Sequence, residues 1–249
     1  MSIVSGSPPA APASMGGLSS AVEDLSVLPE MNSLRFDGNS YLSRTFGNGG
    51  NRNNWTFSAW AKRSNISVQQ AIFAAYQDSS NRDVLRFRGN NLEYQVGNSG
   101  NFYTHTSSSV FRDSSAWYHI VLAVNWTTQL LNVYVNNEVV ATQIGGGFSQ
   151  PATNIQTIHY IGGRNAGAGV NSIYNGYLAN IQFIDGQALD AESFGEWISD
   201  IWKPRPYTGD YGVNGFHLDF AGENMVYDSN GKLTQVLDAS SNDNHWTAH

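Results

Sequence analysis

The chain has 249 residues, with 13 Lys and Arg against 20 Asp and Glu, and it contains no cysteine. The lack of cysteine excludes disulfides, iron–sulfur clusters and thiolate zinc sites. A formal net charge of −7 without any clustered run of Lys and Arg argues against a protein that tracks nucleic-acid phosphates. No apolar run approaches the ~20 residues that span a bilayer. We therefore expect neither nucleic acid nor membrane insertion.

The N-terminal 32 residues differ from the rest. Residues 1–17 are mostly Ser, Pro, Ala and Gly, which is typical of an extended, flexible arm, and they lack the charged and apolar regions of a secretory signal. Ser20 and Glu23 then have the spacing of a capping box, and the pattern stops at Pro29. This predicts a short amphipathic helix that packs either on its own domain or on a neighbouring subunit. Its apolar face consists of Leu18, Val22, Leu25 and Leu28.

From Ser33 onward, short segments rich in β-branched and aromatic residues alternate with clusters of Gly, Asn and Ser. This is the pattern of strands joined by short turns. Alternation is clearest at 55–62, where Trp55 and Phe57 share one face of the predicted strand. With only a brief helical turn expected after Asp190, the pattern predicts an all-β antiparallel sandwich. The predicted strands are 33–37, 55–62, 71–76, 84–88, 92–96, 118–125, 131–135, 138–142, 158–161, 177–184 and 215–220.

Four phrases resemble the concanavalin A-like jelly rolls of the laminin G and pentraxin type. They are SLRFDGNSYLS at 33–43, WTFSAWAKR at 55–63, WYHIVLAVNW with LNVYVNNEVVAT at 117–142, and IGGR with YNGYLANIQFIDGQALDAESFGEW at 161–197. In this resemblance Asn136 and Asn137 form a hairpin turn, and Gly176 permits a close approach before the strand that runs through Phe183. It implies a jelly-roll β-sandwich of two curved sheets over residues 33–200, with a concave face that binds glycans in many relatives.

The C-terminal extension, residues 201–249, resembles a narrower group. The phrases WKPRPYTGDYGVNGFHLDF and DASSNDNHWTAH look like a variant found in virion proteins of tailed bacteriophages, especially marine ones. This implies a non-enzymatic structural protein on the virion surface, as a capsid decoration, head fibre or tail component. We expect residues 1–32 to attach it to major capsid or tail proteins, and we expect a homo-oligomer. The alternative is a receptor-binding lectin for host polysaccharide; a polysaccharide depolymerase is a third hypothesis.

Catalytic carboxylates are not evident in the pattern. Enzymes of the resembled fold that cleave glycans need two carboxylates facing one cleft, which on a strand means alternating positions, and no E-x-D-x-x-E phrase occurs. Glu93 stands alone on its predicted strand and Glu138 lies beside a turn, whereas Asp190, Glu192 and Glu196 belong to the predicted helical turn. The Gln-Ile-His triplet and Arg-Glu-Arg strand of alginate lyases are missing as well. We therefore expect no enzyme and no catalytic residues.

Metal ligands are also scattered. The six histidines lack the spacing of a zinc site, and we expect His119 and His159 to be buried in the core. The resemblance implies calcium at the rim in some relatives, for which Asp37 and Asp185 are the nearest acidic residues. Both precede glycine, however, and Asp-Gly pairs more often form plain turns. We therefore expect no metal and no cofactor.

Glycan binding is the function for which the sequence offers candidate residues. Sugars are recognised by aromatic faces together with planar amides and Arg, and segments predicted to be exposed loops carry such residues. We expect the four residues Trp55, Trp60, Trp117 and Trp126 to pack in the core instead. The candidate glycan-binding residues are Asn101, Tyr103, His105, Arg164, Asn165, Asn171 and Tyr174.

Overall fold

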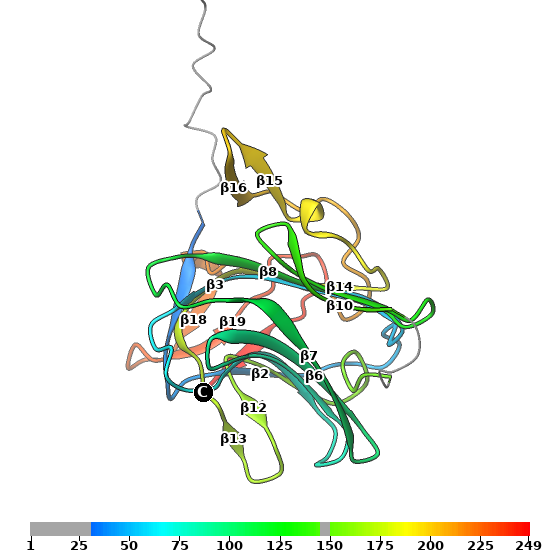
Figure 1. The fold of residues 1–249 in the computed structure, drawn as a ribbon. Coiled ribbons are helices and arrows are strands. Elements are labelled where there is room, and N and C mark those ends of the chain that lie inside the picture. The colour runs from blue at the N-terminus through cyan, green and yellow to red at the C-terminus, as the bar shows by residue number, and fades with distance from the viewer. Residues whose placement is uncertain (1–30, 145–149) are drawn as a thin grey trace, which may run out of the picture. The chain divides into compact units, whose positions relative to one another are not determined.

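The computed structural model describes residues 31–144 and 150–249, which form two large antiparallel sheets packed face to face (Figure 1). Sheet A has the strand order β1-β14-β3-β8-β9-β10, with β17 also paired to β14. Sheet B has the order β18-β19-β20-β2-β11-β4-β5-β6-β7. The predicted antiparallel sandwich is therefore confirmed.

The element bounds extend most of the predicted strands by a residue or two. Sheet A contains β1 (Ser33–Asp37), β3 (Asn54–Arg63), β8 (Tyr118–Asn125), β9 (Leu130–Val135), β10 (Glu138–Ile144), β14 (Asn175–Asp185) and β17 (Phe216–Leu218). Sheet B contains β2 (Leu42–Thr45), β4 (Gln70–Tyr76), β5 (Arg82–Arg88), β6 (Asn91–Asn98), β7 (Asn101–Val110), β11 (Ile158–Ile161), β18 (Met225–Tyr227), β19 (Leu233–Val236) and β20 (Trp246–Ala248).

Two small hairpins and two short 3-10 helices complete the described elements. The hairpins are β12 (Arg164–Asn165) with β13 (Val170–Asn171), and β15 (Gly195–Ile198) with β16 (Ile201–Pro204). The 3-10 helices are η2 (Ala191–Ser193), which is the turn expected after Asp190, and η3 (Gly222–Asn224). In the described part of the chain, no helix has the length and apolarity needed to cross a membrane.

The main core lies between the two sheets. Trp55 and Phe57 on β3 point into it as the alternation predicts, and both side chains are fully buried. Phe57 stacks on Phe73 of β4 with ring centroids 4.5 Å apart, so an aromatic pair links sheet A to sheet B. His159 is buried here as expected and stacks on Phe46. Aromatic pairs of this kind contribute beyond their buried area.

A second, smaller core covers the outer face of sheet A. The opposite face of β3 carries Trp60, which is only 5% exposed. Trp60 packs in a cluster with Phe194 and Trp202, which come from the chain that follows β14. In Figure 1 the β15–β16 hairpin lies on this side of sheet A. Both faces of β3 are therefore buried, which strict alternation alone does not predict.

The C-terminal strands enter both sheets. β17 extends sheet A, whereas β18, β19 and β20 form one edge of sheet B. Trp246 on β20 is fully buried and meets Phe216 of β17 with ring centroids 5.0 Å apart. Residues 201–249 therefore contribute to the main core from both layers.

Two backbone predictions are confirmed. Asn136 and Asn137 have φ values of 49° and 71°, as a tight hairpin between β9 and β10 requires. A Cβ at Gly176 would lie 2.1 Å from the backbone oxygen of Lys62 on β3. Only glycine therefore allows β14 and β3 to pair here.

Some predictions are wrong or lie outside the described residues. Glu196 lies in β15 and not in the predicted helical turn. Most of the predicted arm, with its apolar face of Leu18, Val22, Leu25 and Leu28, lies outside the described residues.

Candidate functional site

The outer face of sheet B carries a row of arginines from β5. The inward residues Leu85 and Phe87 belong to the main core, and successive strand residues point to opposite faces. Arg82, Arg86 and Arg88 occupy the alternate positions of this strand and therefore point outward. We use the name arginine face for these three residues together with Arg164 of β12 and Glu93 of β6.

The centre of the arginine face is a buried ion pair. Arg86 aligns with Glu93 across β5 and β6, and its Nε and Nη2 donate to the same Glu93 oxygen, Oε2, at 3.1 and 3.0 Å. Their side chains are only 4% and 10% exposed, and Arg88 lies 3.9 Å from the same oxygen. Burial lowers the pKa of Arg86, but its partner Glu93 favours the charged form. The pair thus holds one guanidinium in a fixed position on the sheet.

Polar side chains continue from this pair toward the edge of sheet B. Arg86 Nη1 lies 3.5 Å from Gln95 Oε1, and Gln95 Nε2 donates to Thr104 Oγ1 on β7 at 3.0 Å. Thr106 aligns with Glu93 and therefore shares the same face. Amide and hydroxyl groups accordingly lie next to the guanidinium groups across three strands.

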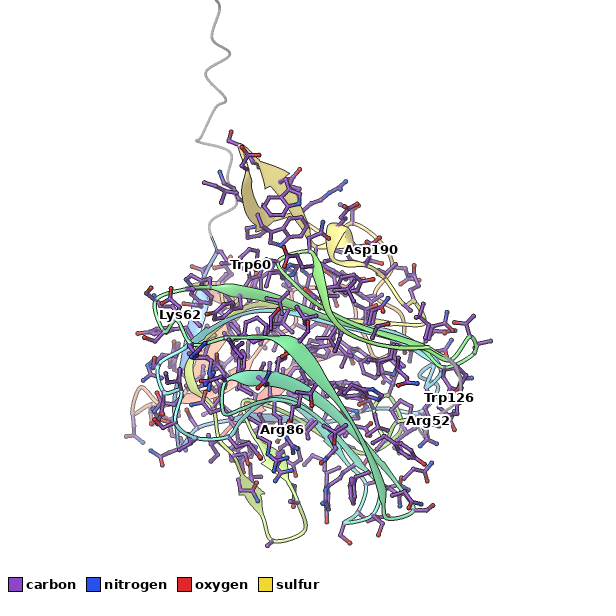
Figure 2. The ribbon with its side chains drawn as sticks, in the orientation of Figure 1. Arg52, Trp60, Lys62, Arg86, Trp126 and Asp190 are labelled. Carbon is purple, nitrogen blue, oxygen red and sulfur yellow. The ribbon has the colours of Figure 1, made fainter. Side chains whose placement is uncertain are left out.

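The β12–β13 hairpin is seated on this face by a small apolar cluster. Val170 of β13 packs against a cluster of buried residues of sheet B that consists of Ala71, Ala74, Val84 and Tyr160. At the base of the hairpin, a Cβ at Gly163 would lie 2.9 Å from Val170, so glycine permits this approach. Figure 1 shows the hairpin on the outer side of sheet B, and β6 and β7 bend toward the same side. Figure 2 shows Arg86 on that side.

Arg164 projects from the hairpin toward the β5 arginines. Its Nε donates to Asn171 Oδ1 at 3.2 Å and to Ser172 Oγ at 3.3 Å. Burial lowers the pKa of Arg164 to about 10, and the positive charges of Arg86, Arg82 and Arg88 add to this effect. Within the described residues, its terminal nitrogens Nη1 and Nη2 have no hydrogen-bond or ion-pair partner. The charged Nη1 and Nη2 groups of Arg164 are therefore available to bind a ligand, and they lie near the positive charges of the three β5 arginines.

The predicted glycan residues fall into three places. Arg164, Asn165 and Asn171 lie together on the β12–β13 hairpin. Asn101, Tyr103 and His105 lie on the strand β7, so their placement in a loop is wrong. Asn101 and Tyr103 are exposed as expected, whereas His105 is buried.

Tyr103 and His105 align with the core residues Val96 and Tyr94, and they therefore face away from Arg86. Tyr174 is fully buried against Phe36, with ring centroids 6.2 Å apart. Its expected exposure is therefore wrong, and its ring is not accessible to a ligand.

The residues that the sequence analysis missed are Arg82, Arg86, Arg88, Gln95 and Thr104. A signal for the arginines is present in the phrase RDVLRFR at 82–88, where arginines occupy alternate positions of one strand. Such spacing places all three on one face. Arg164 is far from residues 82–88 in the sequence. Its place on the arginine face could therefore be recognised only once the position of the β12–β13 hairpin was known.

The acidic residues considered for metal binding have other partners. Asp37 Oδ1 accepts hydrogen bonds from the backbone N–H groups of Asn39 and Ser40, as in a turn. The Asp185 carboxylate accepts from Asn51, Asn154 and Asn214. Because N–H donors already point at these oxygens, the arrangement does not fit a calcium ion. No group of three or more His, Asp or Glu within 31–144 and 150–249 is arranged to hold a metal ion.

Known structures share this architecture. A protein from Bacteroides ovatus named as a candidate carbohydrate-binding protein superposes with a TM-score of 0.61 at 17% identity, covering 88% of this chain and 58% of that one. Domain 4 of an extracellular arabinanase from Geobacillus stearothermophilus, in complex with arabinotriose, gives 0.51 at 15% identity, covering 63% and 71%. Domains LG4-5 of the mouse laminin alpha1 chain give 0.49 at 12% identity, covering 78% of this chain and 49% of that structure. A comparison with curated proteins found no match.

The sandwich and its hairpin-flanked outer face define a jelly-roll protein of the lectin-like class. A sequence profile described as the concanavalin A-like lectin/glucanases superfamily matches residues 36–193. The chain belongs to this family. It spans 58% of the Bacteroides ovatus protein, so similarity covers a part of that protein and not its whole length.

Proposed function

We propose that this chain is a non-catalytic glycan-binding protein whose sugar lies against the arginine face. The observation that carries the proposal is the grouping of Arg88, Arg164, Gln95 and Asn171 on one side of sheet B. Their side chains supply guanidinium and amide groups, which match the hydroxyl donors and acceptors of a sugar ring.

The comparisons support the class of ligand. The domain 4 of the arabinanase that shares this fold was solved with arabinotriose, and the Bacteroides ovatus protein is named for carbohydrate binding. Among the residues assigned to the arginine face, the single carboxylate, Glu93, is committed to Arg86. This favours a binding role for the face over acid–base cleavage, which needs two carboxylates.

A glycan array with the full-length protein tests the proposal. We expect binding to at least one glycan, and we expect Arg164→Gln to weaken it. The matched control is Arg112→Gln, which removes an exposed arginine that follows the buried Phe111. Absence of binding to every glycan would contradict the proposed function.

We further propose that the protein is a structural component of a tailed-phage virion, attached through residues 1–32 to capsid or tail proteins as a homo-oligomer. The support comes from the sequence: the two C-terminal phrases within 201–249 and an N-terminal arm rich in Ser, Pro, Ala and Gly. Display on a particle is compatible with glycan binding. A protein on the particle surface that binds host polysaccharide would attach the particle to its host.

Deletion of residues 1–30 tests the attachment. We expect the truncated protein to be absent from purified particles, whereas the full chain is incorporated. Unchanged incorporation would refute attachment through the arm.

A further inference from the structure

We propose that the glycan held by the arginine face is anionic, with a carboxylate or sulfate group on its sugar ring that is bound by Arg88 and Arg164. This inference rests on the proposed glycan-binding function and specifies the chemical class of the ligand.

The charges of the arginine face favour an anionic ligand. The chain carries a net charge of −7, yet in the described part of the chain two carboxylates interact with the four arginines of this face. One is Glu93, and the other is Asp78, whose pKa is lowered by hydrogen bonds from Asn81 and Ser80 and further by Arg82. Repulsion between the like charges raises the free energy of the protein, and a neutral sugar would not reduce it. An anion bound among these residues relieves that repulsion.

Two arginines of the face are accessible to a ligand. The Arg88 side chain is 61% exposed, and the Nη atoms of Arg164 lack partners within the described residues. Arg82 by contrast lies over the Phe102 ring, 4.6 Å from its centroid, and donates to the Ser79 carbonyl. Arg88 remains largely exposed although it lies 3.9 Å from Glu93 Oε2, so both guanidinium groups keep donors available for a ligand. Each presents paired N–H donors that match two oxygens of a carboxylate or sulfate.

Fixed neighbours orient the two available arginines. Arg86 is held by Glu93 at 3.0 Å and is nearly buried, so this ion pair, whose charges largely offset each other, stays in place beside Arg88 and Arg164. Asn171 and Ser172 hold the Arg164 Nε at 3.2 and 3.3 Å. Arg164 therefore reaches a ligand from a preorganised position, which reduces the entropy lost on binding.

The limited extent of the face favours a sugar over nucleic acid. The available cations come from two side chains, whereas strong binding to nucleic acid neutralises about 6–10 phosphates. The neighbouring Gln95, Thr104 and Asn171 also offer donors and acceptors suited to ring hydroxyls. The face thus fits one charged group with hydroxyls around it.

Matched pairs of polymers test the inference with the full-length protein. Polygalacturonate is compared with its methyl ester, which masks the carboxylate, and dextran sulfate is compared with dextran. We expect the protein to prefer the anionic member of at least one pair by at least about tenfold in affinity. Which pair shows the preference distinguishes a carboxylate from a sulfate.

Arginine variants locate the binding. Arg88→Gln with Arg164→Gln should remove the preference, whereas Arg112→Gln should keep it. Arg88→Gln alone, at a largely exposed position, provides a variant that keeps the fold intact. Persistence of the preference in the double variant would overturn the assignment to this face. Binding of array glycans without any anionic preference would overturn the inference while leaving the proposed function in place. Binding to no glycan at all would instead overturn the proposed function and, with it, this inference.

Discussion

The indole Nε1–H of Trp202 donates a 2.9 Å hydrogen bond to Nδ1 of His119. This bond ties the β15–β16 hairpin to the centre of sheet A. Because indole nitrogen is only a donor, Nδ1 must accept, and the imidazole proton therefore resides on Nε2. That Nε2–H donates to Ser58 Oγ at 2.9 Å. Burial lowers the pKa of His119 to about 3, so the ring remains neutral at neutral pH.

Replacement of Trp202 by Phe tests this link. The variant keeps an aromatic ring but leaves His119 Nδ1 buried without a donor. We expect a loss of about 1–3 kcal/mol in the free energy of unfolding, measured by denaturant titration. Trp197→Phe on the neighbouring strand is the control, because Trp197 is 55% exposed. Equal effects of the two substitutions would argue against the hydrogen bond as a source of stability.

Asp83 predicts a pH dependence of stability. Burial raises its pKa to about 7, against the opposing effect of hydrogen bonds from Thr153. Between pH ~4 and ~7 the folded protein therefore holds a proton on Asp83 that the unfolded chain has released. This contribution to stability is fully present below pH ~4 and disappears as the pH rises to ~7.

Asp83→Asn removes this proton uptake. We expect the stability of the variant relative to the natural protein to increase as the pH rises from ~4 to ~7, by up to about 4 kcal/mol. Comparing the two proteins cancels the opposite effect of the buried histidines, which both proteins share. Unfolding curves across this pH range provide the measurement, with the exposed Glu196→Gln as control. A difference that does not vary with pH would show that Asp83 is already ionised in the folded protein.

Arg63 is a buried cation whose two terminal nitrogens donate to carbonyl groups. Its Nη1 donates to Phe111 O at 2.7 Å, its Nη2 donates to Gly89 O at 2.9 Å, and the guanidinium lies 4.4 Å from the Phe87 ring centroid. A lysine ammonium lacks the planar fork that joins both carbonyls and stacks on the ring. We expect Arg63→Lys to destabilise the fold by about 2–4 kcal/mol in thermal or denaturant unfolding. An effect no larger than that of the exposed Arg112→Lys would contradict this role.

Asn154 lies in a buried polar network around Asp185. Its Nδ2 donates to Asp185 Oδ1 at 2.6 Å, and its Oδ1 accepts from Asn214 Nδ2 at 2.9 Å. Asn154→Asp places a second carboxylate beside the first, so we expect a loss of about 2–4 kcal/mol at neutral pH. The loss should shrink in acid, because one shared proton relieves the repulsion. Unfolding near pH ~5 and ~8 measures this, and Asn101→Asp on exposed β7 serves as control. A loss independent of pH would indicate a steric effect instead.

The strand pattern could be predicted wherever alternation and apolar content agree. β3 shows both, and its Trp55 face lies in the core as expected. β7 was missed because its phrase NFYTHTSSSV is largely polar, and it lies at the edge of sheet B with much of it exposed. An edge strand held by backbone pairing needs little apolar signal.

The candidate site was predictable only in part. Arg164 and Asn171 were identified from residue type, but their partners on β5 were not, because the predicted strand began at 84 and its arginines were read only as strand positions. Tyr174 was assigned to the surface, yet it packs on Phe36, 138 positions earlier in the chain. Contacts between residues so far apart follow from the pairing of β1 with β14. The local composition of the sequence does not predict this pairing.

Hydrogen exchange of the full-length protein, with and without the glycan that binds best, tests whether the glycan lies on the arginine face. Ligand binding slows exchange in the backbone segments that it stabilises. We expect added protection in β5, β6 and the β12–β13 hairpin, and no added protection in the β15–β16 hairpin on the outer face of sheet A. Protection confined to the outer face of sheet A, with none on the arginine face, would contradict this expectation.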